Sequence, residues 1–178
     1  MKSRAAYFFP VAVALFFSPV QARAGNGVET AGDVLQIVLP AFSLGQTIYM
    51  RDKTGALQFG ESLALSMGVT YGLKYTVVET RPNGGSHSFP SGHSVASFTA
   101  AEYTRKRYGW AWGIPMYVAA SFVAYSRVES RQHHPQDVAV GAGIGIASSF
   151  LFTRPFAGFN VQPTVGKKSA GITVSKQF

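Results

Sequence analysis

The chain has 178 residues and no cysteine, which excludes a disulfide framework and a thiolate metal site. Hydrophobic residues make up 47% of it and charged residues 13%, so it is more apolar than a typical soluble domain but less apolar than a multi-span membrane protein. The length favours one domain. The net charge of +8 favours anionic partners such as phosphate, anionic lipid or nucleic acid, although targeting and topology signals account for part of it.

The first 24 residues are typical of a secretory signal. Lys2 and Arg4 form a positive start, an apolar stretch follows over 7–17, and 22–24 is a small-x-small cleavage site. We expect cleavage after residue 24, with an uncleaved anchor as the alternative, and a linker over 25–32. This signal predicts export to the bacterial cell envelope, into the periplasm.

Five apolar segments follow, separated by glycine and proline. They predict an all-α fold over 33–155, an up-down bundle of about five to six helices with short connections. The expected helices cover 34–50, 59–78, 91–107, 110–125 and 138–153. In the tail, 156–178, two strand-like stretches flank a turn-prone segment at 166–171, which predicts a small hairpin or an unstructured end.

The composition leaves membrane association open. The longest uncharged run, 108–126, has nineteen residues, close to the ~20 that a span needs. Basic residues at 51, 53, 105–107 and 154 fall at segment ends, as either a positive-inside topology or a soluble up-down bundle would place them. We favour a soluble or peripheral periplasmic protein, with an integral membrane bundle as the alternative.

A first polar cluster ends the second segment. Lys74 and Arg81 are seven residues apart, about two helical turns, so we expect them to face the same way, although Pro82 disfavours a helix continuing through Arg81. Two cations in an apolar segment need a counter-charge. The alternative is a solvated basic stripe.

A second cluster, Pro90-Ser91-Gly92-His93, begins the third segment. Proline suits a first helical turn, and the free amides of Gly92 and His93 at a helix N-terminus favour an anion. Ser91 offers a hydroxyl to the same place, and His93 an imidazole. The alternative is an ordinary capped helix start.

A third cluster joins the fourth and fifth segments. His133 and Asp137 are four residues apart, and Pro135 predicts a bend that keeps them close. A carboxylate bonded to an imidazole fixes its tautomer and stabilises its charged form. Arg127 supplies a forked donor suited to phosphate. We assign no role to the neighbouring His134.

In an up-down bundle these segment ends share one rim. Three cations, a helix N-terminus and two histidines then predict a cradle for a phosphoryl group or another tetrahedral oxyanion. The two histidines can divide attack and protonation between them. The sequence shows no carboxylate cluster for a metal pair, so we expect metal-free phosphoryl transfer with Lys and Arg stabilising the charged oxygens.

The three clusters, in this order, resemble the three-part signature of the type 2 phosphatidic acid phosphatase/haloperoxidase superfamily. All eleven fixed positions are present between 74 and 137: Lys74, Arg81, Pro82, Pro90, Ser91, Gly92, His93, Ser126, Arg127, His133 and Asp137. The resemblance implies a helical phosphatase with a phosphorylated substrate, no cofactor, and no nucleic-acid partner.

The resemblance also implies a role for each site residue. His133 would form a phosphohistidine, Asp137 would orient it, and His93 would protonate the leaving oxygen and then activate water. The implied phosphate ligands are Lys74, Arg81, Ser91, Gly92 and Arg127.

The resulting hypothesis is a metal-independent phosphatase acting on a phosphomonoester or pyrophosphate of a lipid. The alternative is a broad-specificity periplasmic acid phosphatase with soluble substrates. A vanadate-dependent haloperoxidase and a non-catalytic envelope protein are less favoured. The sequence does not determine the substrate or the oligomeric state.

Overall fold

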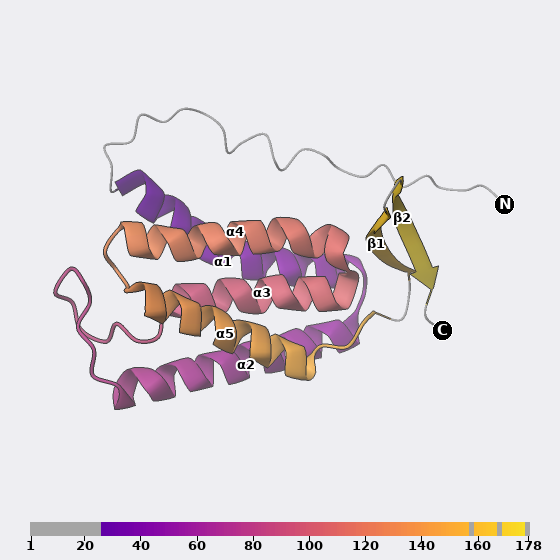
Figure 1. The fold of residues 1–178 in the computed structure, drawn as a ribbon. Coiled ribbons are helices and arrows are strands. Elements are labelled where there is room, and N and C mark those ends of the chain that lie inside the picture. The colour runs from indigo at the N-terminus through magenta and orange to yellow at the C-terminus, as the bar shows by residue number, and fades with distance from the viewer. Residues whose placement is uncertain (1–25, 157–158, 167–168, 177–178) are drawn as a thin grey trace.

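The computed structural model describes residues 26–156, 159–166 and 169–176. The expected signal at 1–24 lies outside them. Five helices and a two-stranded hairpin follow one another (Figure 1): α1 Asn26–Tyr49, α2 Lys53–Thr76, α3 Gly92–Tyr108, α4 Trp110–Glu129, α5 Pro135–Phe152, β1 Phe159–Gly166 and β2 Ser169–Lys176. The predicted helical bundle is confirmed.

The central element of the bundle is α3, which contacts the other four helices. The helices run up and down, so the ends of α2 and α4 and the starts of α3 and α5 lie at one end of the molecule (Figure 1). The start of α1 lies at this end too. The predicted rim is therefore confirmed, with α1 as an additional member.

Two glycines on α5 bring its backbone directly onto α3. A Cβ at Gly145 would lie 2.6 Å from the carbonyl oxygen of Val95, and one at Gly141 would lie 2.7 Å from that of Ser91. Glycine is therefore required at both positions for this close approach. The amide of Ser91 also donates to the carbonyl of Asp137 at 3.1 Å, which joins the starts of the two helices.

Much of the buried interior is polar. Small hydroxyl side chains join the helices, for example Ser43 to Thr104 at 2.8 Å and Thr47 to Tyr103 at 2.8 Å. At the end away from the rim, the forked guanidinium of Arg107 holds the buried carboxylate of Asp52 through two hydrogen bonds of 2.6 Å.

Many large apolar side chains, by contrast, face outward. They include Ile37 and Ile48 on α1, Leu57 on α2, Ile114, Val118 and Phe122 on α4, and Leu151 on α5. Among the described helices, none has both the length and the hydropathy that crossing a membrane demands.

Two sequence expectations were wrong. Residues 26–32 are not a linker, because α1 begins at Asn26, and Glu29 and Asp33 in these first turns bond to Arg127. Lys74 and Arg81 do not share a helix face, because α2 ends at Thr76 with an extended residue after it. Arg81 therefore lies in the loop between α2 and α3.

The strand-like tail forms the hairpin that was one of two expectations for it. The strands β1 and β2 pair antiparallel, with Val161 opposite Val174.

Candidate active site

The structure brings His133 and Asp137 together. His133 lies in the turn between α4 and α5, where its amide donates to the carbonyl of Arg127 at 3.1 Å. Only 3% of the residue is exposed. Its Nδ1 lies 3.4 Å from Oδ2 of Asp137, close enough for an ion pair but long for a hydrogen bond.

Asp137 is held from two further sides. Its Oδ2 accepts a hydrogen bond of 2.5 Å from the hydroxyl of the buried Ser88 and one of 2.9 Å from the amide of His134. Burial acts to raise the pKa of Asp137, but these hydrogen bonds hold it below its ordinary value. Asp137 is thus an anion at neutral pH. Sequence reasoning missed Ser88, because the residue lies outside the three motifs.

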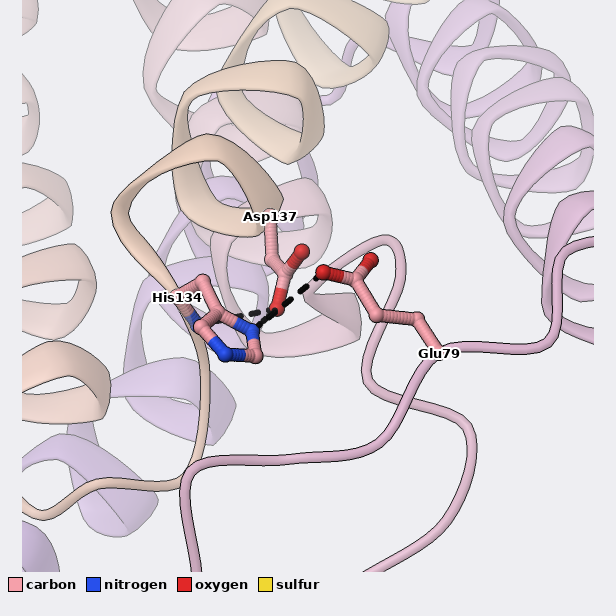
Figure 2. Close-up of side chains that lie close together, drawn as sticks. All are labelled: Glu79, His134 and Asp137. Atoms are coloured by element: carbon pink, nitrogen blue, oxygen red, sulfur yellow. Dashed lines mark hydrogen bonds and ion pairs between the residues drawn. The ribbon is translucent and has the colours of Figure 1, made fainter.

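The imidazole of His134 and the carboxylate of Glu79 also lie close to the carboxylate of Asp137. Figure 2 shows Nδ1 of His134 between Oε1 of Glu79, at 3.3 Å, and Oδ2 of Asp137, at 3.5 Å. Ligand atoms of these three residues lie within 4.8 Å of one another, close enough to hold a metal ion. The sequence indicated no carboxylate cluster for a metal pair, and it did not indicate this group of two carboxylates and one imidazole either. Glu79 comes from the loop after α2, and no sequence spacing links it to α5.

This cluster fits a network of hydrogen bonds and ion pairs better than a metal centre. The oxygen of Asp137 that faces His134 already accepts two hydrogen bonds, from Ser88 and from the amide of His134. A metal ion would have to displace at least one of them. The arrangement instead ties the loop after α2 to the start of α5.

Two of the predicted cations, Lys74 and Arg81, come from α2 and from the loop after it. Nζ of Lys74 donates to the carbonyl of His87 at 2.9 Å. Arg81 donates through Nη1 to Gln132 at 3.0 Å, whereas its buried Nε has no acceptor among the described residues. Burial, followed by the charges of Arg81 and Lys74, lowers the pKa of His133 to about 4. The imidazole is therefore neutral at neutral pH.

The start of α3 faces the same region. Ser91 is fully buried and its Oγ accepts from the amide and the hydroxyl of Ser94, so it caps the helix. Gly92 borders open space, because a Cβ there would meet nothing within 4 Å. The first amides of a helix lack intrahelical partners and favour an anion. Gly92 is thus the accessible part of the predicted Pro-Ser-Gly-His site, whereas Ser91 is buried and caps the helix that carries it.

His93 and Arg127 are linked by a residue that the sequence did not indicate. Oδ1 of Asp33, on α1, lies 2.9 Å from Nε2 of His93 and 2.7 Å from Nη1 of Arg127. Nη2 of Arg127 donates to the carbonyl of Glu29 at 2.6 Å, and the arginine is only 3% exposed. The structure therefore places Arg127 at the rim, but its Nη1 and Nη2 already donate to residues of α1.

A pocket of about 250 Å³ adjoins His93 and Lys74. It lies between α1, α2 and α3 and has both apolar and polar walls. Its lining residues are Gln36, Met67, Thr70, Tyr71, Lys74, Gly92, His93 and Ala96.

Taken together, these groups can bind and transfer a tetrahedral oxyanion. Arg81 contributes to the lowered pKa of both His93 and His133, so its charge acts on the two histidines at once. A neutral buried imidazole next to a carboxylate is suited to attack, and a second imidazole can carry the proton. The unpaired Nε of Arg81 is a donor that such an anion would satisfy.

Comparison with known proteins points to one family. The sequence profile described as "PAP2 superfamily" matches residues 83–159. The chain is 32% identical over 141 residues to the lipid A 4'-phosphatase of Helicobacter pylori, covering 72% of this chain and 71% of that protein. It is 33% identical over 122 residues to the lipid A 1-phosphatase of Porphyromonas gingivalis, covering 61% of this chain but 26% of that protein.

A solved structure shares the fold. The crystal structure of LpxE from Aquifex aeolicus superposes with a TM-score of 0.56, covering 67% of this chain and 83% of that chain. The sequence identity is 22%, so this likeness concerns the fold alone.

Proposed function

The chain belongs to the PAP2 superfamily and is a phosphoric ester hydrolase, and we propose that it removes phosphate from a lipid through a phosphohistidine on His133. The observation that carries this proposal is the buried, neutral His133 beside Asp137 and two cations. The assignment of a role to each residue rests on this geometry and on the family signature.

In the first step, His133 attacks phosphorus. Its Nδ1 faces Asp137, so Nε2 is the attacking atom. The bond between phosphorus and the leaving oxygen breaks as the bond between phosphorus and Nε2 forms, and His93 donates its proton to that oxygen. Asp137 stabilises the positive charge that develops on the His133 ring.

In the second step, His93 takes a proton from water and the resulting hydroxide attacks the phosphohistidine. The phosphorus–nitrogen bond breaks, inorganic phosphate is released, and His133 is neutral again. Lys74, Arg81 and the amide of Gly92 stabilise the equatorial oxygens in both steps. No step requires a metal ion.

His93 needs a proton to act first as an acid. Burial, followed by the charge of Arg127, lowers its pKa in the free protein. A bound phosphate brings negative charge to this place, and a nearby anion raises the pKa of an imidazole. Substrate binding would therefore favour the protonated His93 that the first step needs.

The substrate class follows from the relatives and from the pocket beside His93. Both curated relatives described above are named as lipid A phosphatases. The pocket lies on the His93 side, where the leaving oxygen would be protonated, so it would receive the part of the substrate next to that oxygen. Its mixed lining suits a polar headgroup that continues into an apolar chain.

We also propose that the protein associates with membrane lipid through its outer apolar faces. Ile114, Val118 and Phe122 recur every four residues on α4 and are all exposed, while buried helix contacts use small hydroxyl residues such as Ser43 and Ser97. Exposed apolar stripes around a polar interior suit acyl chains better than water.

The proposed location is the cell envelope, with the site facing the periplasm. The support is the signal-like start of the sequence. A positive-inside topology would place the basic residues at the end of the bundle away from the site on the cytoplasmic side. They support this orientation only in part, because Arg107 is paired with Asp52 and Arg105 with Glu102. Partition between carbonate-washed membranes and the soluble fraction tests the association.

The experiment for the activity is phosphate release by the purified chain in detergent with EDTA. Phosphorylated lipids are compared with soluble phosphomonoesters. We expect turnover of the lipids, no turnover with His133→Ala, and a labelled, acid-labile phosphoenzyme that accumulates with His93→Ala. His87→Asn is the matched control, because it removes an exposed imidazole while the backbone carbonyl that holds Lys74 remains.

Three outcomes would contradict parts of this proposal. Full activity of His133→Ala would refute the nucleophile. Loss of activity in EDTA that a divalent ion restores would refute metal independence and implicate the cluster of Glu79, His134 and Asp137. Turnover of soluble esters alone would favour the acid phosphatase.

A further inference from the structure

The first turns of α1 cover the anion-binding groups of the site. Asp33 bonds to both His93 and Arg127 through the same oxygen. The carbonyl of Glu29 takes another donor of Arg127. The side chain of Glu29 accepts from Gln132 at 2.8 Å, and Gln132 in turn accepts from Arg81. One helix end therefore contacts, directly or through Gln132, three groups of the proposed site.

Asp33 is bound in the way a phosphate oxygen would be. Its Oδ1 receives one guanidinium donor and one imidazole nitrogen, at 2.7 and 2.9 Å. A carboxylate and a phosphate present the same kind of anionic oxygen to a guanidinium. The side chain of Asp33 is 47% exposed, whereas that of Arg127 is 3% exposed. The carboxylate therefore lies between solvent and the buried cation.

We propose that Asp33 occupies the place of a phosphate oxygen between Arg127 and His93 in the free enzyme, and that the substrate phosphate displaces it. This inference rests on the proposed phosphatase function. Two like charges cannot share the same pair of donors at these distances, so phosphate binding and the Asp33 contact compete. Displacement also frees Nε2 of His93, the nitrogen that now faces Asp33, to serve the leaving oxygen.

The approach of α1 to Arg127 is built into the helix. A Cβ at Gly32 would lie 1.9 Å from Oγ of Ser126 and 2.7 Å from Nη2 of Arg127. Only glycine lets the backbone pass this close. Asp33 follows Gly32 directly and is thereby held over the arginine.

The test is anion binding by the purified full-length chain in detergent. Inorganic phosphate and orthovanadate are titrated by calorimetry into the wild type, Asp33→Asn and Glu29→Gln. Asparagine keeps the size of the side chain and its oxygen but not the charge. We expect Asp33→Asn to bind both anions about three- to tenfold more tightly, a modest gain because the carboxylate is half exposed and screened. The KM for a turned-over lipid phosphate should fall by a similar factor.

Glu29→Gln is the matched control. It also removes one negative charge from the start of α1, but its side-chain oxygen still accepts from Gln132 and its carbonyl still holds Arg127. We expect its anion affinity to stay within about twofold of wild type, since the lost charge is solvent-screened. An equal gain in anion affinity in both variants would show that the effect comes from net charge alone, and it would overturn the proposal.

Two further results would also overturn it. One is unchanged or weaker anion binding by Asp33→Asn. The other is a fall in kcat at constant KM, which would make Asp33 a positioning residue for His93 instead. Failure of the proposed function is a separate result, in which the wild type releases no phosphate from any lipid. Calorimetry would still report the competition in that case.

Discussion

The contact between α3 and α5 yields a quantitative prediction for Gly145→Ala. The added Cβ would lie 2.6 Å from the carbonyl oxygen of Val95 and 2.8 Å from the amide of Thr99. Both atoms belong to backbone, so no side chain can rotate away. Ordinary contact begins near 3.4 Å, and the two helices must therefore move apart by up to about 0.8 Å.

The expected cost follows from two opposing terms. Overpacking of this kind costs about 1 to 3 kcal/mol, and replacing glycine by alanine inside a helix returns up to about 1 kcal/mol. We expect a net loss of up to about 2 kcal/mol in the free energy of unfolding. Because α5 carries Asp137 in its first turn, the shift should also lower kcat, by about tenfold.

Gly143→Ala is the matched control. Gly143 lies on the same helix, but a Cβ there would meet nothing within 4 Å. The substitution should raise stability by about 0.5 to 1 kcal/mol and leave kcat unchanged. Urea unfolding followed by circular dichroism in one detergent, with phosphate release measured alongside, compares the two variants. Equal stability of both would refute the close packing of α3 on α5.

Three further predictions concern His133 and Asp137. Ser88→Ala should lower kcat by about tenfold, because the buried carboxylate of Asp137 loses a charge-assisted hydrogen bond worth about 1.5 to 3 kcal/mol. The control Ser86→Ala removes an exposed hydroxyl from the same loop and should leave kcat unchanged. Equal phosphate release by both variants would contradict the role of Ser88. The pKa of about 4 for His133 places the acid limb of kcat/KM near pH 4, not near the ordinary 6.5. In the unfolded chain His133 binds a proton below about pH 6.5, whereas in the folded protein it does so only below about pH 4. The free energy of unfolding should therefore fall as the pH falls from 6.5 to 4. His133→Asn should weaken this dependence of stability on pH. An acid limb near 6.5, seen with a substrate whose phosphate does not itself titrate there, would contradict the lowered pKa of His133.

Helix content and the rim were predictable because they depend on local pattern. Apolar segments broken by glycine and proline predict helices whatever surrounds them, and alternation of direction then places the motif-bearing ends together. The helix starts were less predictable. The polar first turns of α1 and α2 carry no apolar periodicity, and α1 extends back to Asn26 because Glu29 and Asp33 find partners on Arg127.

The sequence by itself determined the fold class and the family signature, and it named most residues of the candidate site: His133, Asp137, His93, Lys74, Arg81 and Gly92 all lie at one rim. Only the tertiary structure showed that Arg127 is occupied by Asp33, that Ser88 and His134 hold Asp137, and that Glu79 joins them. The physical reason is the separation of these residues along the chain. Motif residues are recognised by short spacings along one segment, whereas Asp33 and Ser88 act on groups that are remote in the chain and close only after α1 and the loop before α3 have packed against the bundle.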